Sequence, residues 1–496
     1  MGPSTKPHHV FLLALLATSL PASPAQNAQK VLEDYLRAMG GAKALAQIQT
    51  ATIAGSLTEE STGQTGSYSL IAKAPNRLCL EIIAGSGREV EAYNGMSAWG
   101  QDTAEGLRTL TGAPAKEAEA SARYWNSRLA DVKKAKFNLR LVGLEKVRGR
   151  DAYHVQVTMG PGLTREVFFD AQSHLIVKEA EPASALEIEY DDYQPSDGIP
   201  TPHRIEIRRG GHQYKVAVTR AEFNRPVEDT AFDIPHPAGA LLPDIKGLIM
   251  EVTKNQKAID ELQKQYTCHV TEEEQKVDSK GRIASSTAKE YEVFNIAGDE
   301  VRHLIAKDGK PLAGDEKKKE DERFNKEYDK MEKKAGAPVD AKKQAQEDAK
   351  DQAQISDFLR AVRFLNLRRE RFRGHDVIAV DFGPNPEYKP KKMIEGIIQK
   401  LMGVVWIDEQ ALDVVRLEGH FADTAKIGGG VLAAIDKGSS FVFEQAKMND
   451  EVWLPVYAEF HVAGRFLVIK ARANEIDRYS DYKKFKTDSR ILSIKN

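Results

Sequence analysis

The stretch VRGRDAYHVQV, residues 147–157, decides how this chain of 496 residues divides, because it returns as FRGHDVIAVDF at residues 372–382. In each copy Arg, Gly, a basic residue and Asp precede a segment in which apolar and polar residues alternate. Alternation of this kind is typical of a β-strand with one buried face. We interpret the phrase as a hairpin turn in which Gly149 and Gly374 take positive φ and the following Asp caps the turn. The sequence therefore predicts equivalent corners in two similar sheets.

Two further pairs of motifs keep the same order in both halves. VFFD (residues 167–170) is matched by VWID (residues 405–408), and DGIPTPHRIEI (residues 197–207) is matched by DEVWLPVYAEF (residues 450–460). Each motif of the VFFD type combines a strand with a turn that Asp begins. Three motifs in register predict a duplicated domain, with longer insertions in the second copy.

Each half also begins with apolar residues at helical spacing, which predicts an amphipathic helix before the strands. In the first half, Gly40-Gly41 supplies the stop. The two apolar sets are Ala28, Val31, Leu32, Tyr35, Leu36 and Met39 in the first half, and Leu248, Val252, Ile259, Leu262 and Tyr266 in the second.

Helices are also expected between the early and late strands of each half. Residues 115–136 carry an apolar stripe in the first half, and residues 315–350 are dominated by Lys, Glu, Asp, Ala and Gln in the second. We expect the second segment to form two helices joined at Pro338, followed by an amphipathic helix over residues 355–364. A disordered charged linker is the alternative interpretation of residues 315–350.

The N-terminus predicts export. Residues 10–20 form an unbroken run of apolar and small residues, and Ser23-Pro24-Ala25 offers small residues for cleavage. The run is about half of the ~20 residues that a membrane-spanning helix needs. We expect a signal peptide at residues 1–25 and a soluble exported protein, with no Cys after the run to carry a lipid anchor. An uncleaved apolar N-terminus is the alternative.

Composition excludes several classes. A formal net charge of -2 gives no basic field that would attract phosphate backbones, so nucleic acid is not an expected partner. The two cysteines, Cys79 and Cys268, are too few for a disulfide scaffold. They can form one bridge or remain two separately buried thiols, and we favour the second interpretation.

Motifs for catalysis are not found in the sequence. It holds no Gly-x-Ser-x-Gly elbow, no His-Glu-x-x-His, no Cys-x-x-Cys and no glycine-rich phosphate loop. Histidines are scattered singly and no pair of carboxylates stands out, although any two acids can meet in space. Anion binding by Arg148 and Arg373 is the alternative to a purely structural turn. We expect no catalytic residues, no metal site and no cofactor, and hence no enzyme.

Apolar residues in the second half exceed what a sheet with one buried face requires. GGGVLAAI (residues 428–435) is followed by Phe441-Val442-Phe443, and residues 394–402 predict a short amphipathic helix. One interpretation is a packed core, and the other is that helices close over a curved sheet and leave a space for an acyl chain. Because VFFD and VWID both place an aromatic at the same position, we hypothesise that this aromatic faces the helices. The candidate ligand-binding residues are Phe168, Trp406, Trp125, Phe441 and Phe443.

The helix that ends in Gly-Gly, the sheet interrupted by helices, the VFFD and VWID turns and the late Asp-Gly-hydrophobic-x-x-Pro strand resemble the outer-membrane lipoprotein-sorting family (LolA-like), which is similar to RseB-like envelope stress sensors. The resemblance covers nearly the whole chain as two tandem copies. It implies an α+β fold, mainly antiparallel β, with two half-barrel sheets and helices on the concave face of each. The implied parts are a signal peptide at residues 1–25, half-barrel domains at residues 26–235 and 244–496, a linker at residues 236–243, and a charged helical insertion at about 313–352.

This resemblance implies a periplasmic protein that binds or carries lipid or lipoprotein by sheltering acyl chains in apolar half-barrels. The expected partners are acyl chains of lipids or lipoproteins and a membrane protein of the cell envelope. The first alternative is an envelope sensor or protein-interaction scaffold of RseB-like type, and the second is an enzyme with an unrecognised site. The duplication and the charged insertion distinguish this chain from a single-domain carrier.

Overall fold

The structure is a computed structural model of the whole chain. It describes residues 27–160, 162–235, 242–263, 265–278, 282–296, 299–335, 361–390, 393–427, 433–449, 451–466 and 469–484. The predicted signal peptide, most of the predicted linker, the end of the charged insertion and most of residues 428–435 lie outside the described residues.

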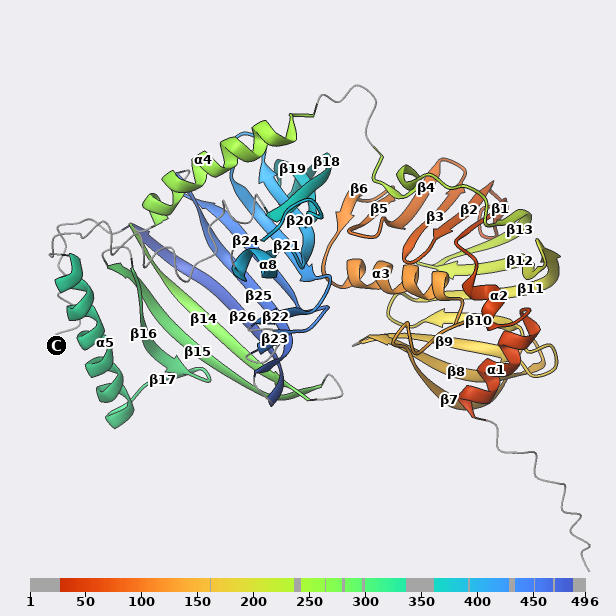
Figure 1. Cartoon of the computed structure of the whole chain (residues 1–496), viewed down its shortest axis with the longest axis horizontal. Helices are drawn as coiled ribbons and strands as arrows, with labels where there is room; N and C mark the ends of the chain where they lie inside the picture. Colours follow the sequence, from red (N-terminus) through yellow and green to blue (C-terminus); the bar gives the residue numbers. More distant parts are fainter. Residues whose placement is uncertain are drawn as a thin grey trace, which may run out of the picture. The chain divides into compact units, whose positions relative to one another are not determined.

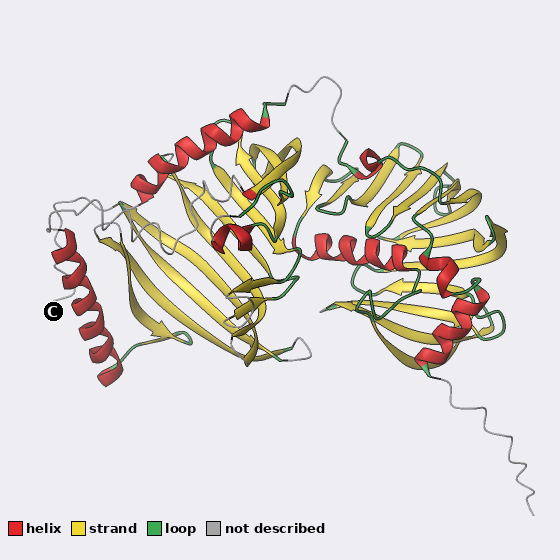
Figure 2. Ribbon diagram, viewed as in Figure 1, coloured by secondary structure: helices red, strands yellow, loops and turns green. Residues whose placement is uncertain are grey.

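Strands dominate the described chain and form two antiparallel sheets (Figures 1 and 2). The first sheet has the strand order β6-β5-β4-β3-β2-β1-β13-β12-β11-β10-β9-β8-β7. Its strands are β1 Thr50–Glu59, β2 Thr65–Lys73, β3 Arg77–Ala84, β4 Gly87–Tyr93, β5 Ala98–Asp102, β6 Gly106–Leu110, β7 Asn138–Val147, β8 Arg150–Gly160, β9 Leu163–Asp170, β10 Ile176–Glu181, β11 Leu186–Ser196, β12 Ile199–Arg209 and β13 His212–Phe223.

The second sheet has the order β17-β16-β15-β14-β26-β25-β24-β21-β20-β19-β18, and β23 pairs with both β22 and β25. Its strands are β14 Tyr266–Val277, β15 Ile283–Ile296, β16 Asp299–Lys307, β17 Lys310–Pro311, β18 Val362–Phe372, β19 His375–Pro384, β20 Leu401–Asp408, β21 Val414–Phe421, β22 Ala425–Ile427, β23 Ala433–Ile435, β24 Ser440–Met448, β25 Val452–Phe466 and β26 Ile469–Lys484. In both sheets the first strand of the half (β1 or β14) lies beside the last one (β13 or β26). This shared order agrees with the predicted duplication.

Helices interrupt each set of strands, as the sequence predicts. The first helix, α1 (Ala28–Ala38), ends before Gly40 and Gly41, whose φ angles of 92° and 101° suit glycine alone. The others are α2 (Ala42–Ala46), α3 (Gly112–Ser127), the 3-10 helix η1 (Asp229–Phe232), α4 (Ile245–Gln263), α5 (Gly314–Ala335) and α8 (Met393–Ile398). The first helix of the charged insertion is therefore present as α5.

Four helix predictions are wrong at their ends. Helix α3 ends at Ser127, inside the predicted segment 115–136, and Leu401 and Met402 of the segment predicted as a helix over residues 394–402 belong to β20. The other two errors lie at the borders of β14 and β18. Tyr266, expected on the last turn of a helix, is the first residue of β14, and Val362 and Phe364 belong to β18 instead of a helix. Pairing across the sheet explains both, because Tyr266 lies opposite Lys484 and Phe364 lies opposite Phe382. Ladder formation outweighs a helical spacing of apolar residues when both patterns fit the same segment.

The repeated phrase forms the predicted hairpin turn in both halves. Arg148 and Gly149 have φ of 48° and 80°, and Arg373 and Gly374 have φ of 48° and 88°. Two successive residues with positive φ define the tight turn whose twist matches that of the flanking strands. The glycine prediction is therefore confirmed.

Polar side chains at these turns are used differently from the prediction. The carboxylate of Asp151 does not cap the turn but pairs with Lys146 across the hairpin, at 2.9 Å. The guanidinium of Arg148 lies 2.5 Å from Glu189, and that of Arg373 lies 2.5 Å from Glu444. Both arginines thus bind acids of this chain, which tie the turn to the sheet.

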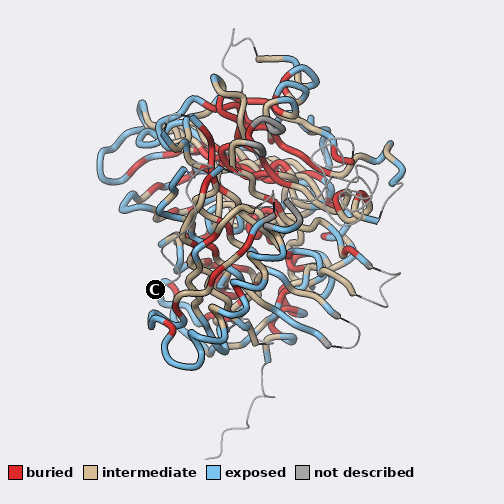
Figure 3. Tube along the Cα trace, turned by 90° about the vertical axis from the view of Figure 1, so that its left-hand side faces the viewer, coloured by how far each residue is buried: buried red, intermediate tan, exposed pale blue. Residues whose placement is uncertain are grey.

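The fold is α+β, mainly antiparallel β, with two half-barrel sheets, as predicted. Helices α4 and α8 pack on one face of the second sheet, but α5 packs on the other face, where the ring of Phe324 lies 5.5 Å from that of Phe294. The prediction that the helices of this half share the concave face is therefore wrong for α5, because its apolar stripe meets Phe294 on the opposite side of β15. Buried stretches run along the strands, and the joining turns are exposed (Figure 3). Both cysteines are free, and burial raises the pKa of each thiol to about 11.

The chain separates into two compact units, Met1–Gln47 with Ser127–Ala217 and Ile48–Asn126 with Val218–Asn496. The second unit therefore contains strands β1 to β6 of the first sheet together with the whole second sheet. Independent folding of residues 26–235 and 244–496 stays a prediction.

Candidate functional site

Strand pairing in the second sheet aligns side chains in rows, because directly paired residues point to the same face. The first row is Val380, Val405, Leu417, Phe443, Ala458, Asp477, Glu272 and Lys289. The second row is Phe364, Phe382, Gly403, Gly419, Phe441, Phe460, Glu475 and Glu274. Both rows are apolar as far as β25 and become charged at β26.

Helices α4 and α8 pack on the face that carries these rows. Leu248 of α4 belongs to one buried cluster with Val380 and Val405. Ile398 of α8 belongs to another buried cluster with Phe382. The rows therefore lie on the helix-covered face of the second half-barrel.

Gly419 lets two aromatic rings lie directly on this face. A Cβ atom at Gly419 would be 2.8 Å from Cζ of Phe441 and 3.1 Å from Cζ of Phe382, both too close for an unstrained contact. Phe382 is fully buried and Phe441 is half-buried. The absence of a side chain at Gly419 thus creates the flat place where these rings meet the sheet.

Exposure increases along this face from the helices toward β25. Phe441 and Phe443 are half-buried, whereas Phe460 keeps 37% and Val462 keeps 43% of its surface exposed. We call these four residues the apolar strip. The strip continues the core under α8 and opens to solvent at its outer end.

Charged groups begin directly beside the strip. Glu475 is paired with Phe460, and Asp477 is paired with Ala458, so both carboxylates share the face of the strip. Burial, and after it the charge of Glu475, raises the pKa of Asp477 to about 6. An apolar surface that ends in carboxylates suits an amphiphilic ligand.

Trp406 lies on the opposite face, so the hypothesis that it faces the helices is wrong. It is paired with Ala379 and Arg416, and the Arg416 guanidinium lies 5.6 Å from the Trp406 ring centre. Its indole Nε1 donates a hydrogen bond to Glu370 at 3.1 Å. The physical reason is that a cation over the ring covers a large aromatic on a charged face.

Phe168 repeats this arrangement in the first sheet, so the same correction applies. Its ring stacks on His154 at 4.3 Å, and Lys178 lies 5.8 Å above it. The next residue, Phe169, contacts Tyr35 of α1 at 5.3 Å between ring centres. Because neighbours on a strand point to opposite faces, Phe168 points away from α1.

The five candidate ligand-binding residues are therefore not brought together as one set. Phe441 and Phe443 share the helix-covered face of the second sheet, Trp406 lies behind them, and Trp125 is half-buried on α3. Contact of any of them with a ligand stays a prediction. Sequence reasoning missed Phe460, Val462, Glu475 and Asp477 as site residues, although the alternation of residues 458–462 is a signal that places the apolar ones on one face.

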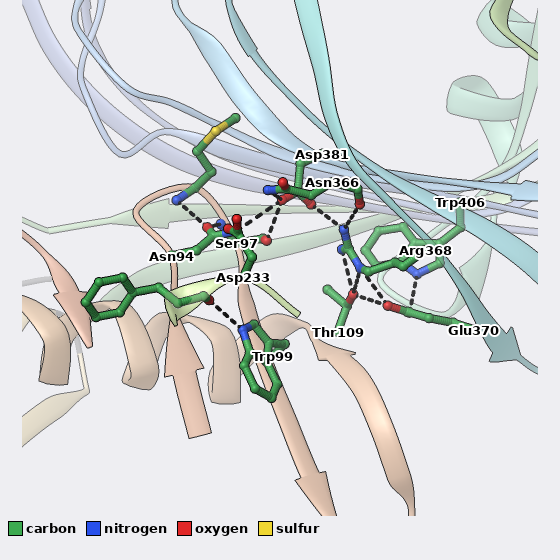
Figure 4. Close-up of polar contacts among 12 residues, drawn as sticks. Asn94, Ser97, Trp99, Thr109, Asp233, Asn366, Arg368, Glu370, Asp381 and Trp406 are labelled. Atoms are coloured by element: carbon green, nitrogen blue, oxygen red, sulfur yellow. Dashed lines mark hydrogen bonds and ion pairs between the residues drawn. The ribbon is translucent and has the colours of Figure 1, made fainter. Parts of the chain in front are cut away.

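A buried polar network joins the strands near β5 and β6 to β18 and β19 within the second compact unit (Figure 4). Asp381, with 0% of its surface exposed, accepts hydrogen bonds from Ser97 Oγ at 2.8 Å, Asn366 Nδ2 at 2.9 Å and Arg368 Nη1 at 2.8 Å. A buried carboxylate is stable only when it is paired and hydrogen-bonded. The network therefore requires these segments to stay together.

Arg368 extends the network toward Trp406. Its Nη2 donates to Thr109 Oγ1 at 2.6 Å, and its Nε donates to Glu370 Oε1 at 2.8 Å. Burial alone would lower the pKa of Arg368, but Asp381 and Glu370 raise the pKa above its ordinary value. Partners 259 and 284 positions apart leave no local sequence signal, so the network could not be predicted.

Among the described residues, no helix combines the length and the apolar character needed to cross a membrane. No protein-family profile matches the chain, and no curated protein matches it either.

Solved structures match this chain at low sequence identity. A DUF1329 family protein from Desulfovibrio piger is 15% identical with a TM-score of 0.30, and the match covers 42% of this chain and 97% of that one. A LolA superfamily protein from Nitrosomonas europaea is 14% identical with a TM-score of 0.29, covering 42% and 98%. The complex of MucA with MucB from Pseudomonas aeruginosa is 10% identical with a TM-score of 0.17, covering 92% and 99%.

Proposed function

We propose that this protein binds the acyl chain of a lipid or lipoprotein on the helix-covered face of its second half-barrel, as a carrier in the periplasm. The observation that supports the proposal is the apolar strip, in which half-buried Phe441 and Phe443 continue into exposed Phe460 and Val462. When an acyl chain covers apolar residues that were exposed to solvent, the free energy of the complex is lowered.

Hydrophobic burial is the source of affinity in this proposal. Each CH₂ group transferred from water contributes about 0.8 kcal/mol, so a chain of a dozen methylenes offsets the cost of association without any covalent step. Ile398 of α8 packs at the inner end of the strip beside Phe441. Movement of α8 would lengthen the apolar surface and set the rate of release.

A charge placed in the strip tests the proposal. Phe460→Glu should weaken binding of a fluorescent fatty acid at least tenfold, because the acyl chain would then have to desolvate a carboxylate. Ile283→Glu is the matched control, since Ile283 is also an exposed apolar residue of the second sheet (57% exposed) but lies outside the strip. The control variant should bind like the unmodified chain, and both variants should keep its circular dichroism spectrum.

Organic extracts of the protein purified without detergent provide an independent measurement. Mass spectrometry should find acyl lipids in them, in smaller amounts for Phe460→Glu than for Ile283→Glu. Extracts free of lipid, together with no fatty-acid binding by the unmodified chain, would overturn the proposal in favour of a sensor or scaffold.

A further inference from the structure

Three carboxylates gather where the apolar strip ends. One oxygen from each of Glu272, Glu475 and Asp477 lies within 4.8 Å of the other two. Glu272 and Asp477 are directly paired on β14 and β26, and Glu475 precedes Asp477 by two positions on the same face. The cluster therefore offers at least three acceptor atoms around one point.

Asp477 supplies a second and independent observation. The residue is 4% exposed, and within the described part of the chain no donor reaches its Oδ1 atom. Its Oδ2 atom accepts only a long hydrogen bond from Tyr479, at 3.4 Å. Buried carboxylate oxygens are normally satisfied, so an unpaired one that lies among other carboxylates points to a donor that binds there.

Basic residues nearby serve only one of the three acids. Lys289 lies 3.3 Å from Glu272, and Arg302 lies 3.2 Å from the same carboxylate. Across the described ranges, neither Glu475 nor Asp477 is within ion-pair distance of a basic side chain. Two carboxylates are thus available to a ligand of positive charge.

We propose that this cluster binds the ammonium group of an amphiphile whose acyl chain lies on the apolar strip. A primary ammonium group carries one positive charge and has N–H donors for the carboxylate oxygens of Glu475 and Asp477, which Lys289 and Arg302 leave available. A divalent hard cation needs six or more oxygen ligands, and its double charge is repelled by Lys289 and Arg302 more strongly than the single charge of an ammonium group, so it fits this site less well.

Register fixes how close the two parts of the ligand must be. Phe460 and Glu475 are neighbours across β25 and β26, and one strand spacing is about 4.8 Å. Phe443 and Asp477 are separated by β25 alone, which gives about 10 Å. The ammonium group must therefore lie within a few bonds of the acyl chain, so the preferred ligand class is long-chain amines and lipids with an amine near the chain.

This inference rests on the proposed acyl binding, and two probes with one tail separate the two ideas. Hexadecylamine and hexadecanol, each below its aggregation concentration, compete for the fluorescent fatty acid on the full chain at pH 7.5. We expect the amine to bind about tenfold more tightly than the alcohol, because a charge-assisted hydrogen bond replaces a neutral one. Glu475→Gln combined with Asp477→Asn should remove this difference and leave hexadecanol affinity unchanged.

Glu459→Gln is the matched control, because Glu459 lies beside Phe460 on β25 but on the opposite face, where Tyr457 donates to it at 2.8 Å. It should keep the preference for the amine. Equal binding of amine and alcohol by the unmodified chain would overturn the ammonium site while acyl binding stands, and so would a preference that survives in the double variant. If amine binding required added calcium, the cluster would be a metal site and not an ammonium site. Failure of both probes would overturn the acyl proposal itself.

Discussion

Arg368→Met tests whether the buried network holds the second compact unit together. The substitution keeps most of the side-chain volume and removes the guanidinium that hydrogen-bonds Asp381, Thr109 and Glu370. Asp381 is fully buried, so its charge would lose its only cationic partner among the described residues and keep neutral donors such as Ser97.

Removal of one partner from a buried ion pair costs about 3–5 kcal/mol, most of which is the penalty of the charge that remains. We expect a decrease of this size in the free energy of unfolding. The melting temperature falls by about 2–4 °C for each kcal/mol in domains of 150–250 residues and by less in larger ones, so we expect a total decrease of several degrees.

Urea denaturation followed by circular dichroism measures the change, and Arg369→Met is the matched control. Arg369 is the next residue and also forms an ion pair, with Glu409 at 2.5 Å, but it is exposed to solvent. The control should change stability little, because exposed ion pairs contribute little. If the two variants were equally stable, the idea that Asp381 and Arg368 depend on each other would be refuted.

Three further variants test the site. Gly419→Ala should cost about 1–3 kcal/mol of stability and weaken fatty-acid binding, because its Cβ would lie 2.8 Å from Phe441. A melting temperature equal to that of the unmodified chain would contradict the packing argument. Trp406→Phe should lower the free energy of unfolding by roughly 1–3 kcal/mol, because Glu370 loses a hydrogen-bond donor, and should leave fatty-acid affinity unchanged. Weaker fatty-acid binding would mean that Trp406 lies on the ligand-binding face after all. Asp477→Asn removes a carboxyl whose pKa is raised by burial to about 6 in the folded chain. Ionisation of Asp477 therefore destabilises the folded chain, fully above pH 6 and less as the pH falls toward the ordinary pKa of 3.8. The variant should therefore gain melting temperature at pH 8, and this gain should shrink as the pH falls below 6 and be lost near pH 4. Glu272, Glu475, Tyr479, Lys289 and Arg302 are the charged or titratable neighbours of this carboxyl. A gain independent of pH would contradict the assignment.

The sequence predicted what depends on local chemistry. Positive φ at Gly149 and Gly374, the turns begun by Asp170 and Asp408, and α1 all follow from residues that lie within a few positions of each other. The face of Trp406 was predicted wrongly, because alternation fixes which residues share a face but not which face meets a helix. That choice is made by α4, whose contacts with Val405 join segments more than 150 positions apart.

The two halves share their turns but differ on the helix-covered face. When VFFD is aligned with VWID, Lys178 corresponds to Arg416, and each lies over the aromatic of its motif. The same alignment places Arg165 opposite Gly403 and Glu181 opposite Gly419.

These two differences decide what each face can hold. In the first half Arg165 is 2% exposed, lies 3.2 Å from Glu179 and also pairs with Glu181, so buried charges occupy the position over the sheet. In the second half glycines leave that position to aromatic rings, and Leu417 stands where Glu179 would be. The buried ion cluster of the first half offers no apolar surface to an acyl chain. The apolar strip of the second half does offer such a surface. Acyl binding is therefore expected in the second half, with the first half retained as the scaffold that contributes β5 and β6 to the network around Arg368.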